Sequence, residues 1–222
     1  MNGVARLGLI RNVPEAQANA AIHNLNVRLI PAVRKQPGFV VGIWVSSATN
    51  DTGLSFTVFE SQALGQAAGI AINSEPLLPE QVSVDIPSPD EVFNCEIAAS
   101  VDNGTMPKIG RLAFTGKPAN PQEAEMAGRW LSDEFMPFMK TLPGLCQAYM
   151  LNSLPDMLRI SLTFWESEKV MQEAGGAIGR WSQQQAQEGR MGALEPGEVL
   201  TFPSVVDFVR GEMLTVKQVQ GS

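Results

Sequence analysis

A group of side chains between residues 149 and 165 has the types and spacing needed to hold a small aromatic molecule. Trp165 offers an indole face, Tyr149 a phenolic proton donor, and Asn152 an amide that can bind a carbonyl. Ser161 shares a strand face with Trp165, because strand side chains alternate between faces. We expect Trp165, Tyr149 and Asn152 to carry chemistry and Ser161 to contact a substrate. Each also suits a structural role, as a core aromatic, a packing residue or a turn residue.

Three more side chains extend this set of substrate-binding candidates. Arg159 begins the strand that contains Ser161, and it either stabilises an enolate-like anion or is a solvated charge at a strand end. Trp44 and Phe59 lie in the first half of the chain, and each either lines a pocket or fills the core. Phe59 lacks the indole N–H of its counterpart Trp165, so the two halves need not be equal in function.

The sequence offers little for metal or cofactor chemistry. His23 is the only histidine, and no cysteine or carboxylate cluster accompanies it at the spacing of a zinc site. We expect it on the surface of a helix. Gly175-Gly176 falls within a helical stretch and does not resemble a phosphate-binding loop. We therefore expect no metal and no cofactor.

Charge and composition limit the partners. The net charge of −7 and the pI near 4.8 argue against nucleic acid or an anionic membrane as partner. No stretch approaches the roughly 18 apolar residues of a membrane span. Cys95 and Cys146 lie in apolar, strand-like segments at non-equivalent positions. A disulfide framework is therefore not expected, and a cytoplasmic setting is.

The elements that must position these side chains occur twice in the chain. Residues 54–61 (LSFTVFES) recur as residues 160–167 (ISLTFWES), 106 residues later. Pro37-Gly38 recurs as Pro143-Gly144 at the same offset. A constant offset over this length indicates two whole domains rather than short solenoid units. We expect the two repeats at residues 1–101 and 108–222.

Each repeat has the order strand, helix, strand, strand, helix, strand, which is the ferredoxin-like split unit of an α+β fold. One antiparallel sheet of this kind is covered by helices on one face only. Phe39–Ser46 is a nearly continuous apolar run, which indicates a strand covered on both faces. We therefore expect two sheets that face each other as an intramolecular pseudo-dimer, a barrel with its helices outside. A monomer is the first expectation, and a further homodimer stays open.

Short motifs in both halves resemble the antibiotic biosynthesis monooxygenase domain of the dimeric α+β barrel superfamily. Pro37-Gly38 and Pro143-Gly144 end a helix before an apolar hairpin, which is followed by Phe59-Glu60-Ser61 or Trp165-Glu166-Ser167. The resemblance covers nearly the whole chain as two copies. It implies a cofactor-independent monooxygenase-like protein that acts on a hydrophobic aromatic or polyketide-like molecule, with Trp165 able to line the pocket. Heme-degrading relatives carry an iron-binding histidine in the next helix, and residues 167–187 have none, so heme degradation is not expected.

A second hypothesis is a barrel without catalytic activity that binds a small ligand or serves as a structural module. The absence of any constellation of histidine and carboxylate residues favours it, because acid–base catalysis needs titratable groups near neutral pH. A titratable group inside a strand-end pocket would instead favour an enzyme.

Overall fold

The computed structural model describes residues 3–47, 52–74, 89–118, 120–154, 156–189, 198–202 and 204–210. The first half contains β1 (Val4–Ile10), α1 (Glu15–Asn24), the π-helical turn η1 (Leu25–Leu29), α2 (Ile30–Arg34), β2 (Phe39–Ser47), β3 (Thr52–Phe59), α3 (Gln62–Ser74) and β4 (Glu91–Asp102). The second half contains β5 (Ile109–Phe114), α4 (Pro121–Trp130), the π-helical turn η3 (Leu131–Phe135), α5 (Met136–Lys140), β6 (Leu145–Leu154), β7 (Arg159–Trp165), α6 (Glu168–Gln187), β8 (Val199–Phe202) and β9 (Ser204–Arg210).

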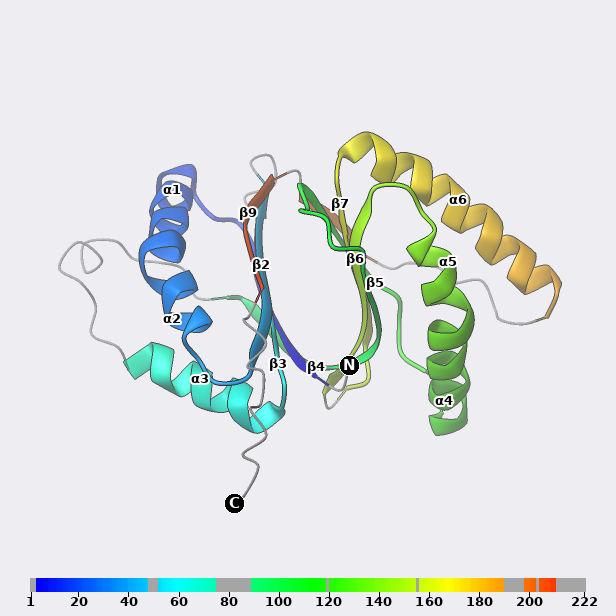
Figure 1. The fold of residues 1–222 in the computed structure, drawn as a ribbon, viewed down its shortest axis with the longest axis horizontal. Coiled ribbons are helices and arrows are strands. Elements are labelled where there is room, and N and C mark those ends of the chain that lie inside the picture. Colours follow the sequence, from blue (N-terminus) through cyan, green and yellow to red (C-terminus); the bar gives the residue numbers. More distant parts are fainter. Residues whose placement is uncertain are drawn as a thin grey trace, which may run out of the picture.

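The described strands form one sheet in the order β8-β5-β7-β6-β4-β1-β3-β2-β9, with antiparallel pairing between neighbours. The sheet curls into two layers that face each other, with α1–α3 outside one layer and α4–α6 outside the other (Figure 1). The expected α+β fold of ferredoxin-like units with external helices is therefore confirmed. None of the helices in the described residues has the length and apolar content that crossing a membrane requires.

The last strand of each half extends the sheet of the other half. The first part of β4 pairs with β1, and its second part pairs with β6 up to the pair Asp102↔Gln147. In the second half β8 pairs with β5, and β9 pairs with β2. The expected boundary at residue 101 therefore falls within a strand, and the connection to β5 begins after Asp102.

Buried side chains form three layers that follow from strand alternation. The layer between the two halves of the sheet takes Val41 and Ile43 from β2, whereas Trp44 of the same strand packs under α2 and α3. This confirms that the apolar run at β2 is covered on both faces. The third layer lies between the second-half strands and α4–α6.

The motif residues hold the start of each hairpin against the helix that follows it. Gly144 has φ +69°, and a Cβ built on it would lie 2.6 Å from Cγ2 of Val170 on α6. Its carbonyl accepts a 2.9 Å hydrogen bond from the backbone N–H of Glu166. Gly38, at φ +71°, repeats this arrangement with Glu60 at 2.8 Å. Glycine is required at these turns both by its conformation and by the space available.

The two π-helical turns lie 106 residues apart, as the sequence motifs do. Each directly precedes a short helix that carries a proline at its second position, Pro31 or Pro137. Proline has no N–H to donate to the preceding turn, and its ring crowds the carbonyl four residues earlier. A wider turn accommodates both effects.

Side chains cap the first turn of three helices. The side chain of Asn120 caps α4 by accepting from Glu123 N–H at 2.9 Å, and Ser61 and Ser167 cap α3 and α6. Asn12 resembles a cap in the sequence, but it lies before the helix with φ +55° and makes no cap of α1.

Candidate functional site

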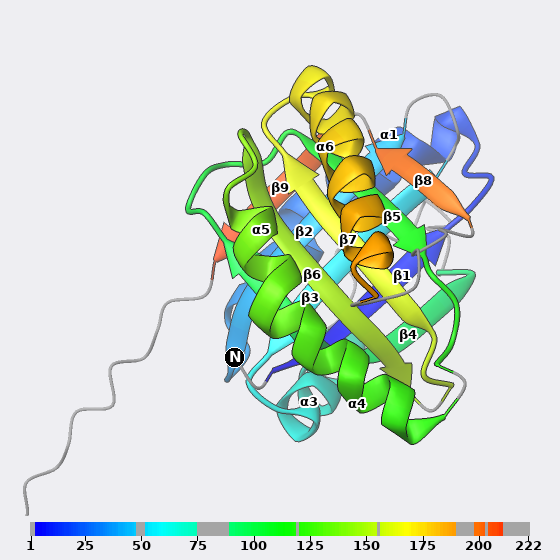
Figure 2. The same ribbon diagram turned by 90° about the vertical axis from the view of Figure 1, so that its right-hand side faces the viewer.

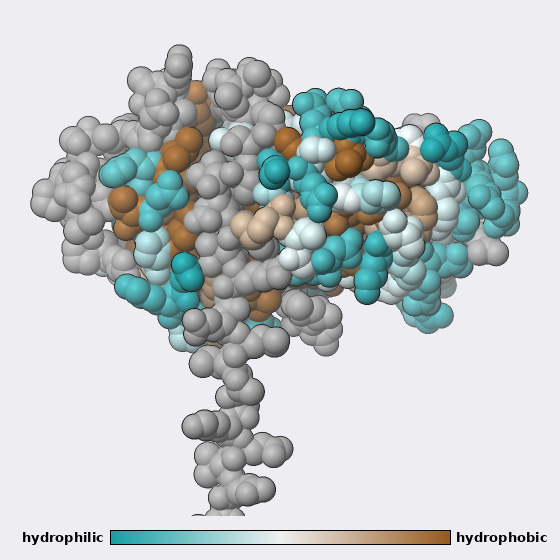
Figure 3. All heavy atoms as spheres, turned by 45° about the horizontal axis from the view of Figure 1, so that its top comes forward, coloured by the Kyte–Doolittle hydropathy of each residue, from teal (hydrophilic) through white to brown (hydrophobic). Residues whose placement is uncertain are grey.

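A cavity of about 550 Å³ lies between the outer face of the second-half strands and helices α4–α6. Figure 2 shows these helices crossing over β6 and β7, and Figure 3 shows hydrophilic and hydrophobic residues mixed on the surface at this end of the molecule. The cavity is large enough for a drug-sized ligand, and most of its wall is apolar. Its helical wall includes Leu131, Phe135, Met139, Met171 and Ile178.

Aromatic stacking joins the helices above the cavity. The ring of Phe135 stacks on Trp130, with centroids 5.3 Å apart and an interplanar angle of 15°. Trp181 of α6 stacks on Phe138 of α5 at 4.6 Å and 5°. These contacts connect α6 to the α4–α5 side of the cavity and hold the helical wall in place.

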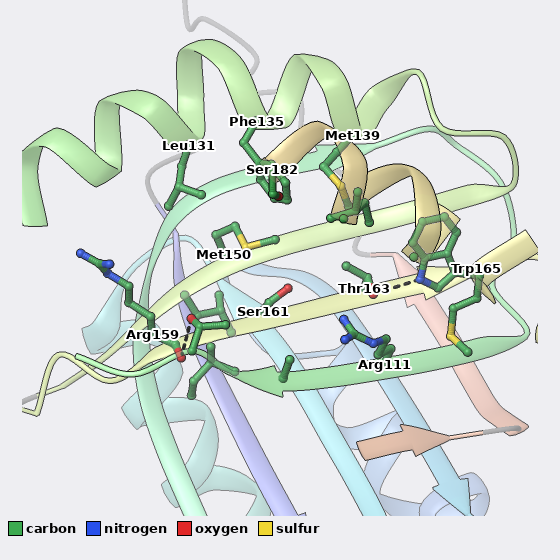
Figure 4. Close-up of a pocket in the computed structure, with 18 of the residues that line it drawn as sticks. Arg111, Leu131, Phe135, Met139, Met150, Arg159, Ser161, Thr163, Trp165 and Ser182 are labelled. Atoms are coloured by element: carbon green, nitrogen blue, oxygen red, sulfur yellow. Dashed lines mark hydrogen bonds between the residues drawn. The ribbon is translucent and has the colours of Figure 1, made fainter. Parts of the chain in front are cut away.

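The floor of the cavity is formed by one face of the sheet. Alternate residues of β7 point toward the helices, namely Arg159, Ser161, Thr163 and Trp165 (Figure 4). Leu162 and Phe164 point to the opposite face and enter the layer between the two halves of the sheet. The structure thus brings Trp165, Ser161 and Arg159 together on one face, and Asn152 of β6 lines the same cavity.

Trp165 and Thr163 form a buried polar pair at one end of the floor. Trp165 is 1% exposed, and its indole N–H donates a 3.0 Å hydrogen bond to Oγ1 of Thr163 (Figure 4). A hydroxyl carries a single proton, and here its oxygen already accepts. The proton of Thr163 is not used by any described residue, so it is available to a ligand.

Arg111 lies directly opposite Thr163 in the pairing of β5 with β7, on the cavity face. Its side chain is half-buried, and it makes no ion pair or hydrogen bond with a described residue. Burial lowers the pKa of its guanidinium, because desolvation disfavours the charged form. No aspartate, glutamate or histidine is among the described residues that line the cavity.

Arg111 is absent from the residues expected from the sequence. The sequence suggests a strand that begins at Arg111, which would place this residue at the end of the strand. In the structure β5 begins two residues earlier, at Ile109, so Arg111 lies within the strand. The structure shows the same pairing in the first half, where Arg6 on β1 lies opposite Thr57, 106 residues before Thr163. Each half therefore has an arginine opposite a threonine in its first strand.

Arg159 occupies the far end of the floor, and its guanidinium points away from Trp165 (Figure 4). Its side chain is 16% exposed, and Nη2 lies 3.7 Å from Oε1 of Glu123 on α4. Nη2 is buried without a hydrogen-bond partner in the described residues. Asn152 is paired with Arg159 across β6 and β7, so this end offers donors and one amide acceptor.

Tyr149 lies on the opposite face of β6 and does not reach the cavity. Its ring packs on Phe56 with centroids 4.7 Å apart, and its O–H donates to Oε1 of Gln147 at 3.3 Å. The pairing of β6 with β7 shifts between Leu145 and Gln147. This bulge reverses the alternation after Leu145, so Tyr149 turns into the layer between the two halves of the sheet.

Trp44 and Phe59 lie under the first-half helices, away from this cavity. Trp44 is 1% and Phe59 is 5% exposed, and the ring of Phe59 meets Phe39 edge-on at 5.9 Å. Trp44 lies 106 residues before Met150, which lines the second-half cavity. The first half thus has a larger, fully buried side chain where the second half has a methionine.

The remaining polar candidates form no second centre among the described residues. His23 is exposed on α1, as expected. No group of three or more His, Cys, Asp or Glu side chains in the described ranges could hold a metal ion. Cys95 and Cys146 are free and buried, and desolvation raises the pKa of the Cys95 thiol to about 12.

No protein-family model matches this sequence, and no curated protein matches it. Solved structures share its fold. An anthrone oxidase-like protein superposes with a TM-score of 0.61, at 16% identity, over 97% of each chain. A candidate monooxygenase from Lactobacillus acidophilus gives a TM-score of 0.66 at 7% identity, covering 95% of this chain and 97% of that one. Another, from Fusobacterium nucleatum, gives 0.64 at 7% identity over 94% of each chain.

Proposed function

We propose that this protein is a monooxygenase-like enzyme that oxidises a hydrophobic aromatic or polyketide-like molecule without a cofactor. The observation that carries the proposal is the largely apolar cavity whose floor bears Trp165, Ser161, Arg159 and Asn152. An apolar site with a few polar groups is the usual form of a small-molecule site. The names of the structures with the same fold, monooxygenases and an anthrone oxidase-like protein, support this reaction class by analogy.

The proposed reaction needs only the substrate and O₂. An activated CH₂ carbon between aromatic rings loses one proton, and the resulting carbanion transfers electrons to O₂. The carbon forms a bond to oxygen, and the peroxide takes up the proton. The O–O bond then breaks as the second C–H proton leaves, which gives a carbonyl group and one water. The substrate carbon supplies all four electrons, so no external reductant is consumed.

In this scheme the protein supplies shape, exclusion of water and stabilisation of negative charge. Trp165 provides a rigid wall beside the reacting ring. Ser161 donates a hydrogen bond from the centre of the floor. Asn152 and Arg159 contact oxygen atoms at the far end of the substrate.

We further propose that the chain consists of two tandem copies, at residues 1–101 and 108–222, that form a monomeric pseudo-dimer. The recurrence of η1 and η3 at an offset of 106, and the equivalent crossing of β4 and β8–β9, support it. The two free, buried cysteines suit a reducing compartment such as the cytoplasm.

A specific observation also favours a second function, a barrel that binds a small ligand without changing it. The described residues that line the cavity include no carboxylate and no imidazole. General acid–base catalysis usually depends on such groups. Under this hypothesis the same ligands bind and leave unchanged.

The test is oxygen uptake by the metal-free protein with a panel of anthrones and hydroquinones, with Trp165→Phe as the comparison. The proposal expects one O₂ consumed for each substrate molecule converted, and slower turnover in Trp165→Phe at unchanged folding. Binding without uptake would overturn the enzyme in favour of the ligand-binding barrel. Neither binding nor uptake across the panel would overturn both.

A further inference from the structure

We propose that the cavity binds its ligand as an anion, with the charged oxygen held between the guanidinium of Arg111 and the hydroxyl of Thr163. The ligand class is a flat aromatic phenolate, enolate or carboxylate. This inference rests on the proposed function in one respect only, since it assigns the same cavity to the substrate.

The first argument is the balance of charge inside the cavity. Two arginines, Arg111 and Arg159, line it, and among the ion pairs of the described residues only Arg159 has a carboxylate nearby, that of Glu123 at 3.7 Å. Arg111 is half-buried in a largely apolar cavity, and no carboxylate is among the described residues that line it. A partly desolvated cation without a partner is unfavourable, and an anionic ligand supplies that partner.

The second argument is the direction of the hydrogen bonds. The indole N–H of Trp165 already occupies one lone pair of the Thr163 oxygen, and the hydroxyl proton remains to be donated. The guanidinium of Arg111 is a donor with no acceptor function. Because Arg111 and Thr163 are register partners on one face, their side chains lie within reach of the same atom. A guanidinium and a hydroxyl proton that reach the same point favour an acceptor there, and a charged oxygen is the strongest one.

This arrangement also accounts for the absence of an acid–base residue from the described lining. A neighbouring cation stabilises the ionised form of a bound phenol or enol and lowers its pKa. The ligand then loses its proton to solvent on binding, and the protein does not need a carboxylate or imidazole to remove it. Arg111 is therefore assigned as a substrate-binding residue that stabilises negative charge.

The test compares two unreactive probes of the same shape, 2-naphthoate and 2-naphthamide, by calorimetric titration. For the wild-type protein we expect naphthoate to bind at least tenfold more tightly than naphthamide. Arg111→Met is expected to weaken naphthoate binding by about tenfold to a hundredfold, the range for a lost charge-assisted hydrogen bond. Naphthamide binding should change by less than about threefold, because the neutral probe loses no ion pair.

The matched control is Arg6→Met, which removes the arginine at the corresponding position of the first half and should leave both affinities unchanged. Equal affinity of the two probes in the wild type, or loss of naphthoate binding in Arg6→Met but not in Arg111→Met, would overturn the proposal. Unchanged naphthoate binding in Arg111→Met would overturn it as well. Because Arg159 also lines the cavity, the wild-type preference alone does not identify Arg111. If Arg111→Met does not fold, Arg111→Gln is compared with Arg159→Gln, and a larger loss of naphthoate binding in Arg159→Gln would overturn the proposal.

The two proposals fail in different ways. Anion selectivity that depends on Arg111, together with no oxygen uptake from anthrones, would retain this inference and refute the oxygenase. Oxygen uptake that is unaffected by Arg111→Met, with no preference for naphthoate, would retain the oxygenase and refute this inference.

Discussion

The indole N–H of Trp165 donates a 3.0 Å hydrogen bond to Oγ1 of Thr163, two residues earlier on the same face of β7. Both side chains are buried, at 1% and 3% exposure. The bond fixes the indole ring against the floor of the cavity, and it occupies one lone pair of the threonine hydroxyl while leaving its proton to donate. One interaction therefore orders both the aromatic wall and the polar end of the proposed site.

We expect Thr163→Val to lower the free energy of unfolding by about 1–3 kcal/mol, because the buried indole N–H of Trp165 loses its acceptor. Ser161→Ala is the control, since Ser161 lines the same cavity without a hydrogen bond to a described residue. It should change stability by no more than about 0.5 kcal/mol. Urea unfolding measures both, and equal stability of the two variants would contradict a structural role for the bond.

We expect Met150→Trp to fill the cavity and abolish binding of 2-naphthoate while the protein remains folded. The first half already has the fully buried Trp44 at the corresponding position. The cavity offers about 550 Å³, so the larger ring has room and should not strain the core. Calorimetry with the probe is the measurement, and thermal unfolding checks the fold. Met126→Trp, at an exposed position on α4, is the control and should bind normally. Normal binding by Met150→Trp would place the ligand elsewhere.

We expect Gly144→Ala to destabilise the protein by more than about 1 kcal/mol. The residue has φ +69°, which costs an L-residue about 1–2 kcal/mol, and the added Cβ would lie 2.6 Å from Val170. Gly128→Ala on α4 is the matched control, because its Cβ would meet no atom within 4 Å. It should stabilise the helix by up to about 1 kcal/mol. Chemical unfolding of both variants should give changes of opposite sign, and a shared sign would refute the prediction.

We expect Arg11→Met to lower the free energy of unfolding at neutral pH and to lower it less at acidic pH. Arg11 donates two hydrogen bonds to Glu198 at 2.7 and 2.9 Å and one to Glu91 at 2.8 Å. The hydrogen bonds from Arg11 lower the pKa of Glu198 below its ordinary value. The stabilisation is therefore complete above the pKa of an unfolded glutamate, about 4.3, and is lost as pH falls through the lower pKa of the folded state.

The measurement for this prediction is the unfolding free energy at steps between neutral pH and about pH 3. These groups are partly exposed, so the loss in Arg11→Met should be about 1 kcal/mol or less at neutral pH. Lys169→Met removes an exposed i,i+4 pair with Glu173 and serves as the control. A deficit in Arg11→Met that stays constant down to pH 3 would exclude Glu198 as the group responsible.

The sequence predicted the layered fold because its signals were local and repeated. The alternation along 159–165 predicted a shared face for Ser161 and Trp165, and the apolar run at 39–46 predicted a strand covered twice. Tyr149 was misplaced because a β-bulge is one extra residue that leaves no mark in composition, yet it reverses every later side chain of the strand. Arg111 was missed because its importance comes from Thr163, its partner on a strand some 50 residues away.

Because β4 pairs with strands of both halves, the two halves depend on each other in a way that two separate domains would not. Part of β4 completes the sheet of its own half, and the rest is the edge on which β6 of the other half is built. β8 and β9 divide their pairing in the same manner. Each half therefore supplies a strand that the sheet of the other half pairs with. Deletion of either half, even one that bound no ligand, would leave its neighbour with an unpaired strand edge and an uncovered apolar face.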